Sequence, residues 1–238
     1  WRAMTDMTDK AGDKGRIAAA DLSIIIPFRC DRPERLENLG AVLRHLRATL
    51  DGAEVIVIED GAQMQGGGVA QAVGAQHVAR INAGAFHRTA LLNLGIETLA
   101  SRRFAASYDT DALIYPAAWA QALALLRAGA PVVFPYGGRF CDVRGALRAR
   151  LLADPDLSPI PAATAQAVSQ KAKGDLVCIN PNSVGGVVLF DRTAYTETLD
   201  RNRLSAAEFE ERLRESLARG LLQGSVAGGI TAPKSVVD

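Results

Sequence analysis

The sequence predicts an α/β protein with a mainly parallel central sheet flanked by helices on both faces. Short β-branched apolar runs alternate with segments whose leucines recur at helical spacing, which is typical of such sheets. The chain has 238 residues, of which 48% are hydrophobic, enough for one large domain with a sizeable core. Polar residues follow several of the predicted strands. Since ligands of open α/β sheets bind outside the carboxyl ends of the strands, we expect one site at that edge.

The first 135 residues show the alternation most clearly. Leu22–Phe28 is a β-branched run closed by a proline, and Glu54–Ile58 is a second apolar run that ends in Glu59-Asp60-Gly61. Pro33 lies where a helix would begin, and Asp51-Gly52 where it would stop. The predicted strands are 22–28, 54–58, 77–81, 104–108 and 131–134, and the predicted helices are 33–50, 88–101 and 116–128.

The alternation weakens after residue 134. We expect a helix over 139–152, a strand over 183–190, a charged amphipathic helix over 206–219 and a flexible tail over 220–238. The first 20 residues lack an apolar period and are expected to form a disordered leader. The prediction is therefore one domain over residues 21–219.

Composition narrows the class of protein. A formal net charge of +1 argues against a nucleic-acid partner or an anionic membrane surface. No segment approaches the roughly 20 apolar residues of a membrane span. Cys30, Cys141 and Cys178 are odd in number and far apart, which argues against a disulfide scaffold. We therefore expect a cytoplasmic protein, either free or peripheral at the inner membrane face.

Asp109-Thr110-Asp111 is the sharpest chemical signal. Two carboxylates separated by one residue, just beyond a strand, can converge on a hard divalent cation such as Mg²⁺ or Mn²⁺. Such a cation commonly bridges to substrate phosphates. On spacing alone, an acidic turn after a strand explains the motif equally well.

Five motifs together resemble a known family. Ser23–Arg29 is similar to the opening strand of family 2 glycosyltransferases, and closer still to β-1,4-galactosyltransferases, whose first strand ends in Pro-Phe-Arg. Val55–Gly61 resembles the family 2 second strand, which ends in two acids and a glycine. Phe86–Gly95 resembles Phe-Asn-Arg-Ala-Lys-Leu-Leu-Asn-Val-Gly. Tyr108–Asp111 lies where those enzymes carry Asp-Val-Asp, and Ser183–Gly186 resembles their Gly-Gly strand. The ordered set is similar to bacterial glycosyltransferases of the glycosyltransferase-A fold.

The resemblance implies a nucleotide-sugar donor, with a UDP-sugar favoured, a glycan acceptor, and a divalent cation, Mn²⁺ or Mg²⁺. It also divides the domain into a nucleotide-binding half, 21–135, and an acceptor half, 136–219. Asp109 and Asp111 would hold the metal. From residue type alone, Phe28 and Phe86 are equally well explained as core residues. The nucleotide-contacting residues that the resemblance implies are Pro27, Phe28, Arg29, Glu59, Asp60, Phe86, Arg88 and Asp109.

The chain departs from the family pattern after the Gly-Gly strand. The Trp-Gly-x-Glu-Asp motif, which supplies the general base, is missing, and the acids nearest its place are Glu208, Glu210 and Glu211. Glu208 is the first choice for the base, and a solvated helix face is the competing interpretation. His45 is expected on a helix surface, and the three histidines make no zinc set.

Two functions from different classes remain. The first is an inverting glycosyltransferase of bacterial surface-polysaccharide synthesis, which needs a cation for the leaving diphosphate and a base for the acceptor hydroxyl. The second is a catalytically degenerate nucleotide-sugar-binding module of a larger glycan-assembly protein or complex. A nucleotidyltransferase is a more distant option, because Phe28–Asp31 is not a glycine-rich phosphate loop.

Overall fold

The computed structural model describes residues 15–136, 140–158, 160, 175–179 and 186–202. The strands are β1 Ile17–Ala18, β2 Leu22–Phe28, β3 Leu50–Asp51, β4 Glu54–Gly61, β5 Gln76–Ile81, β6 Phe104–Tyr108, β7 Val132–Val133, β8 Phe140–Val143, β9 Leu176–Ile179 and β10 Val187–Asp191. The helices are α1 Pro33–Thr49, α2 Gly67–Ala72, α3 Arg88–Leu94, α4 Pro116–Arg127, α5 Gly145–Ala153 and α7 Arg192–Asn202, and the π-helical turn η1 Gly95–Leu99 follows α3.

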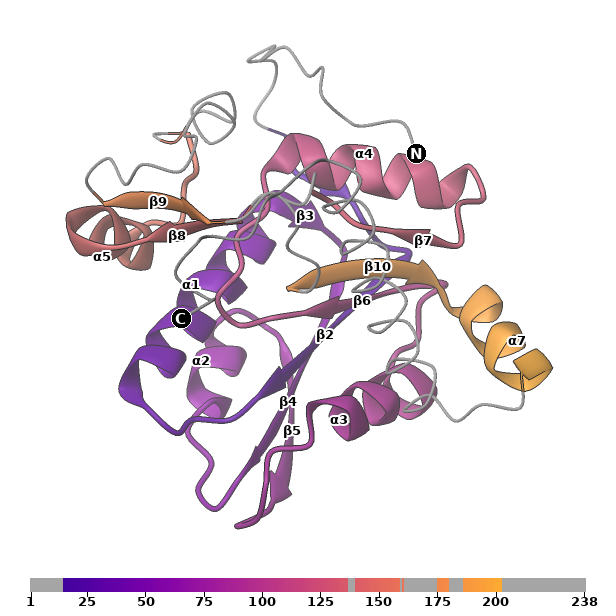
Figure 1. Ribbon diagram of the computed structural model, residues 1–238, viewed down its shortest axis with the longest axis horizontal. Coiled ribbons are helices and arrows are strands. Elements are labelled where there is room, and N and C mark those ends of the chain that lie inside the picture. Colours follow the sequence, from indigo (N-terminus) through magenta and orange to yellow (C-terminus); the bar gives the residue numbers. More distant parts are fainter. Residues whose placement is uncertain (1–14, 137–139, 159, 161–174, 180–185, 203–238) are drawn as a thin grey trace, which may run out of the picture.

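The central sheet has six strands in the order β5-β4-β2-β6-β10-β7. Its first four strands run parallel, and β10 pairs antiparallel with both β6 and β7. Helices lie on both sides of these strands, with α1 and α2 on one side and α3 on the other (Figure 1). The predicted α/β fold with a mainly parallel sheet flanked by helices is confirmed.

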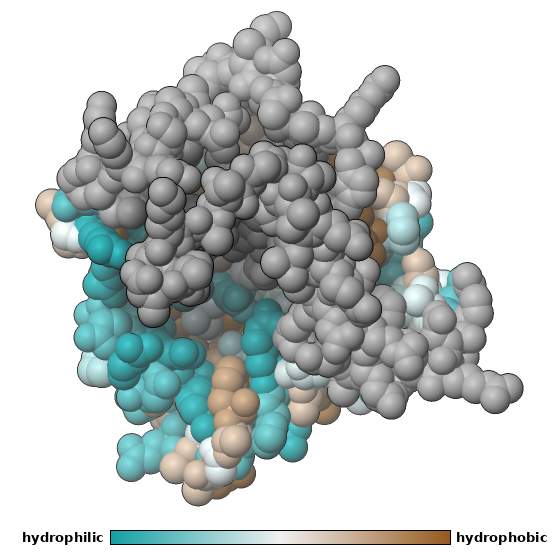
Figure 2. Space-filling model, in the orientation of Figure 1, coloured by the Kyte–Doolittle hydropathy of each residue, from teal (hydrophilic) through white to brown (hydrophobic). Residues whose placement is uncertain are grey.

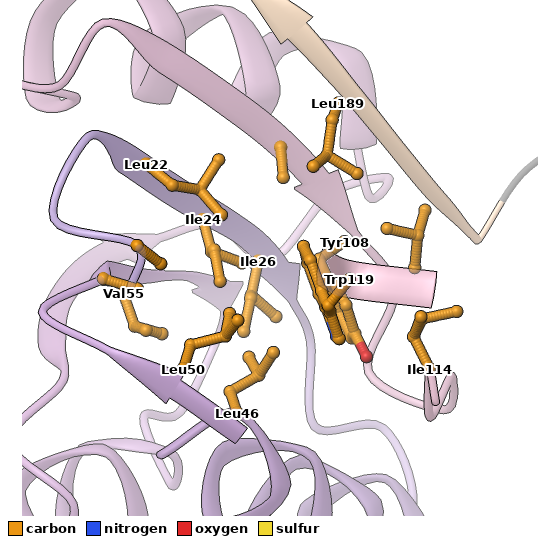
Figure 3. Close-up of a cluster of buried hydrophobic side chains, with 14 of the residues drawn as sticks. Leu22, Ile24, Ile26, Leu46, Leu50, Val55, Tyr108, Ile114, Trp119 and Leu189 are labelled. Carbon is orange, nitrogen blue, oxygen red and sulfur yellow. The ribbon is translucent and has the colours of Figure 1, made fainter. Parts of the chain in front are cut away.

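The alternation of side chains along β2 explains the two helical layers. Leu22, Ile24 and Ile26 pack into a core with side chains of α1, α2 and α4, whereas Ile25 packs into a second core with α3 and η1. Figure 3 shows the first core, in which Tyr108 of β6 stacks on Trp119 of α4 with ring centroids 5.9 Å apart. Because all seven residues of β2 are buried, the strand requires cover on both faces.

Several predicted elements differ from the structure. Ile17 and Ala18 form a strand beside β3, and Ala19 is buried, so the predicted leader over 1–20 reaches too far. Helix α2 lies in residues 62–76, for which the sequence predicts no element. The predicted helix over 139–152 begins as strand β8. The predicted helix over 206–219, the tail over 220–238 and Ser183–Gly185 lie outside the described residues.

One cysteine departs from the sequence expectation. Cys141 is disulfide-bonded, whereas Cys30 is a free thiol. In the antiparallel pair β8–β9, Cys141 lies directly opposite Cys178 in backbone register. The sequence separation of the cysteines was taken to argue against disulfides, and for Cys141 this prediction was wrong. The pairing of β8 with β9 brings segments that are distant in sequence together.

The lengths and hydropathies of the described helices bear on whether any of them could span a membrane. Within the described residues, no helix is long and apolar enough to cross a bilayer. Hydrophilic residues dominate the surface over α1 and α2 (Figure 2).

Gly95 sets the distance between η1 and the sheet. A Cβ atom there would lie 2.5 Å from Cγ2 of Ile25 and 3.1 Å from Cδ1 of Ile58, both in the buried second core. Gly95 has ordinary helical dihedrals, so the close approach alone requires glycine.

We therefore expect Gly95→Ala to lower the free energy of unfolding by about 1–3 kcal/mol, through overpacking. Gly68→Ala is the matched control, because a Cβ at this exposed helical position meets no atom within 4 Å. The control should be neutral or stabilising by up to about 1 kcal/mol. Urea denaturation followed by circular dichroism measures both. Equal stability of the two variants would contradict this account of Gly95.

Candidate functional site

The chain reverses its direction of travel across the sheet between β2 and β6. From β2 the sheet extends to β4 and β5 on one side and to β6 on the other. The β2–β6 register runs from Leu22↔Phe104 to Ile25↔Ser107, although β2 continues to Phe28. The two strands thus separate at their carboxyl ends. Such a topological switch point is where open α/β sheets bind ligands.

An ion pair lies beside this separation on the α3 side. Arg88, the first residue of α3, donates to Oδ1 of Asp109 from Nη2 at 2.7 Å and from Nε at 3.1 Å. The same Nη2 donates to Oγ of Ser107 at 3.0 Å. The backbone N–H of Asp109 donates to the carbonyl of Gly186 at 2.7 Å. This bond places the residue before β10 against the acidic turn, by which we mean residues 109–115. Arg88 and Asp109, both expected at the site, therefore meet.

Asp111 lies two residues further along this turn and is exposed. Among the described residues no side chain forms an ion pair with it, in contrast to Asp109. The pKa of the Asp111 carboxyl is raised, first because burial withdraws part of its water and second because of the Asp109 carboxylate. Arg35 acts in the opposite direction without forming an ion pair, and the net effect is that the folded protein disfavours the negative charge of Asp111.

Arg29, at the end of β2, is held by the ends of the neighbouring segments. Its Nε donates to the carbonyl of Asp60 at 2.6 Å, its Nη2 to Oδ2 of Asp60 at 2.9 Å, and its Nη1 to the carbonyl of Gly84 at 2.7 Å. Asn82 donates to the same Asp60 oxygen at 2.9 Å. Asp60 is 4% exposed, so it acts first as the internal partner of Arg29.

Phe86 completes this group. The guanidinium carbon of Arg29 lies 5.4 Å from the centroid of the Phe86 ring, within cation–π range. Phe86 is half-buried, and it packs against the second core. The structure therefore brings together the predicted residues Arg29, Asp60 and Phe86, and Phe86 lies two residues before Arg88 in the chain.

Glu59 and Phe28 lie on the opposite face of the sheet, and both are 0% exposed. The Glu59 carboxylate accepts bonds from the backbone N–H groups of Gln65 and Gly66, at 2.9 Å each, and contacts Nε2 of His77 at 2.8 Å. Phe28 packs against Gly66 in the first core. Glu59 therefore holds the loop before α2 rather than facing the separation of β2 and β6, and Phe28 is a core residue.

The period of two residues in a strand explains this division. Glu59 and Asp60 are adjacent in β4, so they point to opposite faces. Phe28 and Arg29 are likewise adjacent at the end of β2. Pro27 is buried within β2 and presents no polar group to the site.

Some residues of the site were not predicted from the sequence. Asn82 and Ser107 both bond to the charged residues, and Asn82 could have been found from its position directly after a strand. Glu208, Glu210 and Glu211 lie outside the described residues, so the predicted base stays a prediction.

A divalent cation fits the donor set of the acidic turn. Asp111 offers exposed carboxylate oxygens without a cationic partner among the described side chains, and Asp109 offers the oxygen that Arg88 leaves free. In the part of the chain that the structure describes, no group of three or more His, Cys, Asp or Glu side chains could hold a metal ion. Mg²⁺ is commonly bound by one or two carboxylates, with waters and substrate phosphates as its other ligands.

Comparison with known proteins gives only distant structural likenesses. No family model and no curated protein matches the chain. A CMP:2-keto-3-deoxy-manno-octonic acid synthetase complexed with CTP shares 19% identity over 83% of this chain and 86% of its own, with a TM-score of 0.46. Glucosyl-3-phosphoglycerate synthase from Mycobacterium tuberculosis, in complex with Mn²⁺, UDP and phosphoglyceric acid, shares 17% sequence identity over 79% of this chain and 65% of its own, with a TM-score of 0.41.

Mannosyl-3-phosphoglycerate synthase from Rubrobacter xylanophilus shares 16% identity over 72% of this chain and 54% of its own, with a TM-score of 0.42. The chain thus spans less than two thirds of either synthase. At these TM-scores the likenesses carry no argument about function.

The disfavoured charge of Asp111 predicts a stabilising substitution. Because its pKa is raised in the folded protein above the ordinary value of 3.8, ionisation of Asp111 favours the unfolded chain. We therefore expect Asp111→Asn to have a higher melting temperature than the wild type at pH 7 without ligand. The difference should shrink as pH falls toward 4, where the wild-type carboxyl becomes protonated.

Asp51→Asn is the control, because it makes the same chemical change at an exposed residue paired with Arg16. It should change the melting temperature little at either pH, since exposed ion pairs contribute little. A wild type more stable than Asp111→Asn at pH 7 would show that Asp111 has a partner that stabilises its charge.

Proposed function

We propose that this chain binds a nucleoside-diphosphate sugar, with a UDP-sugar favoured, where β2 and β6 separate, and transfers the sugar to a glycan hydroxyl. One observation carries the proposal. Two arginines and two aspartates, Arg29, Arg88, Asp109 and Asp111, follow or flank the carboxyl ends of β2 and β6, and Asp111 keeps a charge that the folded protein disfavours. Bacterial surface-polysaccharide synthesis is the proposed setting. The cytoplasmic location expected from the cysteine pattern is not part of the proposal, because the disulfide at Cys141 removes the basis for that expectation.

The charges indicate why a cation would be needed. Arg29 is paired with Asp60 and Arg88 with Asp109, so each of these pairs is close to neutral. The remaining charge, on Asp111, is negative and would repel a diphosphate. A divalent cation between Asp111 and the diphosphate would convert that repulsion into attraction. Donor and cation are therefore expected to bind together, each raising the affinity for the other.

The described side chains suggest distinct roles toward the donor. The ring of Phe86 offers an aromatic face for the base, and Arg88 offers the N–H groups that do not bond to Asp109 or Ser107 to the ribose or diphosphate oxygens. Arg29 and Asp60 would act mainly by holding the loop that carries Phe86. Asp109 and Asp111 would hold Mn²⁺ or Mg²⁺, which when bound supplies neutralisation of charge on the leaving diphosphate.

The proposed reaction inverts the anomeric centre. The acceptor hydroxyl oxygen attacks the anomeric carbon, the bond from that carbon to the diphosphate oxygen breaks, and the hydroxyl proton passes to a general base. Arg88 would stabilise the charge that develops on the diphosphate. Glu208 is the proposed base.

Donor binding should depend on a divalent cation and on Asp111. We expect Mn²⁺ to raise the affinity for UDP by at least about fivefold, the lower end of ordinary coupling between two ligands. Asp111→Asn should remove this dependence and leave the fold intact, because the wild-type charge at this position opposes folding and does not support it. Isothermal titration calorimetry with UDP, GDP and CDP, each with and without MnCl₂, measures the effect.

Asp51→Asn again serves as the control and should keep the cation dependence of the wild type. If UDP, GDP and CDP all bind equally well with and without Mn²⁺, the proposed cation role is wrong. If none of them binds under either condition, the proposed donor class is wrong.

The proposed base is tested by turnover. Under saturating donor, Glu208→Gln should lower the rate by about two to four orders of magnitude, the usual contribution of general base catalysis. Glu210→Gln and Glu211→Gln are the controls and should keep the wild-type rate. Unchanged turnover in Glu208→Gln would exclude it as the base. A wild type that binds donor with Mn²⁺ but turns over none of the tested donors and acceptors would instead support the degenerate binding module.

A further inference from the structure

Hydrogen bonds hold the acidic turn at several successive positions. The Asp109 N–H donates to Gly186, as described above, and Oη of Tyr108 donates to the Ala112 carbonyl at 2.8 Å. Oη of Tyr115 donates to the Ile160 carbonyl at 2.5 Å. A further hydrogen bond to this turn comes from His45 of α1. Nε2 of His45 lies 2.8 Å from the Ile114 carbonyl.

His45 is buried, with 3% of its surface exposed, and this corrects the expected place on a helix surface. Its second nitrogen, Nδ1, lies 3.1 Å from the carbonyl of Pro155, so one ring joins α1 to two separate segments. Both residues whose carbonyl groups face the ring are themselves buried. Ile114 is 8% exposed, and Pro155 is also buried. A polar ring in such surroundings is tolerated when it donates a hydrogen bond to a buried carbonyl group.

The two contacts of His45 are not equivalent. Burial lowers the pKa of His45 and outweighs the two carbonyl oxygens, which act in the opposite direction. The ring is therefore neutral and carries one N–H. The shorter contact assigns that proton to Nε2, facing Ile114. His45 thus donates its hydrogen bond to the turn that carries Asp111.

We infer that His45 is a positioning residue for Asp111, an inference that rests on the proposed function only for its consequence in cation binding. Asp111 lies three residues before Ile114, and the turn has no regular hydrogen-bond ladder of its own. Cation ligands require placement within fractions of an ångström, so a turn released at Ile114 holds the cation less well. His45 lies on another element and acts through the backbone of Ile114.

Three variants separate this role from general stabilisation. His45→Leu keeps a side chain of similar size but leaves the Ile114 carbonyl without the donor that His45 supplies. His45→Gln keeps an N–H donor of comparable reach. Leu46→Ala removes a buried side chain of the first core from the neighbouring position of α1 and does not touch the turn through a hydrogen bond.

Two measurements apply to each variant. The first is the Mn²⁺ dissociation constant with saturating UDP, from the electron paramagnetic resonance signal of free Mn²⁺. The second is amide hydrogen exchange over residues 109–115. We expect His45→Leu to weaken Mn²⁺ binding roughly tenfold, the lower end of outer-shell effects on metal sites. Exchange over 109–115 should accelerate, and His45→Gln should restore both quantities toward wild type.

Leu46→Ala should lower the melting temperature without either change. The inference is overturned if His45→Leu leaves exchange over 109–115 at the wild-type rate, or if Leu46→Ala accelerates it equally. If His45→Leu does not fold, His45→Asn replaces it, because the Asn side chain is too short to donate to the Ile114 carbonyl from the same backbone position. A wild type that does not bind Mn²⁺ would contradict the proposed function, whereas the exchange data would still decide whether His45 fastens the turn.

Discussion

The fold depends on the complete burial of β2. All seven of its residues are buried between parallel neighbours, so helices must cover both faces of the sheet. The chain covers the first face with α1, α2 and α4 and the second with α3 and η1. To do so it places β4 on one side of β2 and β6 on the other. The separation of β2 and β6 at their carboxyl ends is a consequence of this order. The charged residues of the candidate site lie at these strand ends.

Charge pairing then differs between the two acids of the turn. Asp109 points to the face where Arg88 begins α3, and the two form an ion pair. Asp111, two residues on, has no such partner among the described side chains, and its pKa is raised. The protein keeps this unfavourable charge although a single amide substitution would remove it. A bound cation is the simplest physical reason for such an arrangement, since perturbed carboxylates cluster at functional sites.

The sequence predicted the elements whose pattern is local. The bounds of β2 and β6 agree with the predicted 22–28 and 104–108, because short apolar runs between polar segments mark them. It did not predict α2, since Gly67 and Gly68 are poor helix formers, and Glu59 holds the loop in front of them through tertiary bonds.

The candidate site was predicted in part, because some of its residues are marked by local sequence patterns and others depend on tertiary contacts. The convergence of Arg88 and Asp109 follows from strand ends, which the sequence marks. The two-residue period of β4 also places Glu59 and Asp60 on opposite faces of the sheet, although the resemblance implied nucleotide contacts for both. The role of His45 was not predictable, because it depends on the carbonyls of Ile114 and Pro155, which come from distant segments.

The central claim is that one cation joins Asp111 to a nucleoside diphosphate where β2 and β6 separate. The most direct test is the magnetic coupling between Mn²⁺ and ³¹P in electron–nuclear double resonance spectra of the protein with UDP. We expect strong ³¹P coupling in the wild type and its loss in Asp111→Asn. Protein-bound Mn²⁺ without ³¹P coupling, or the same coupling in both proteins, would contradict the account.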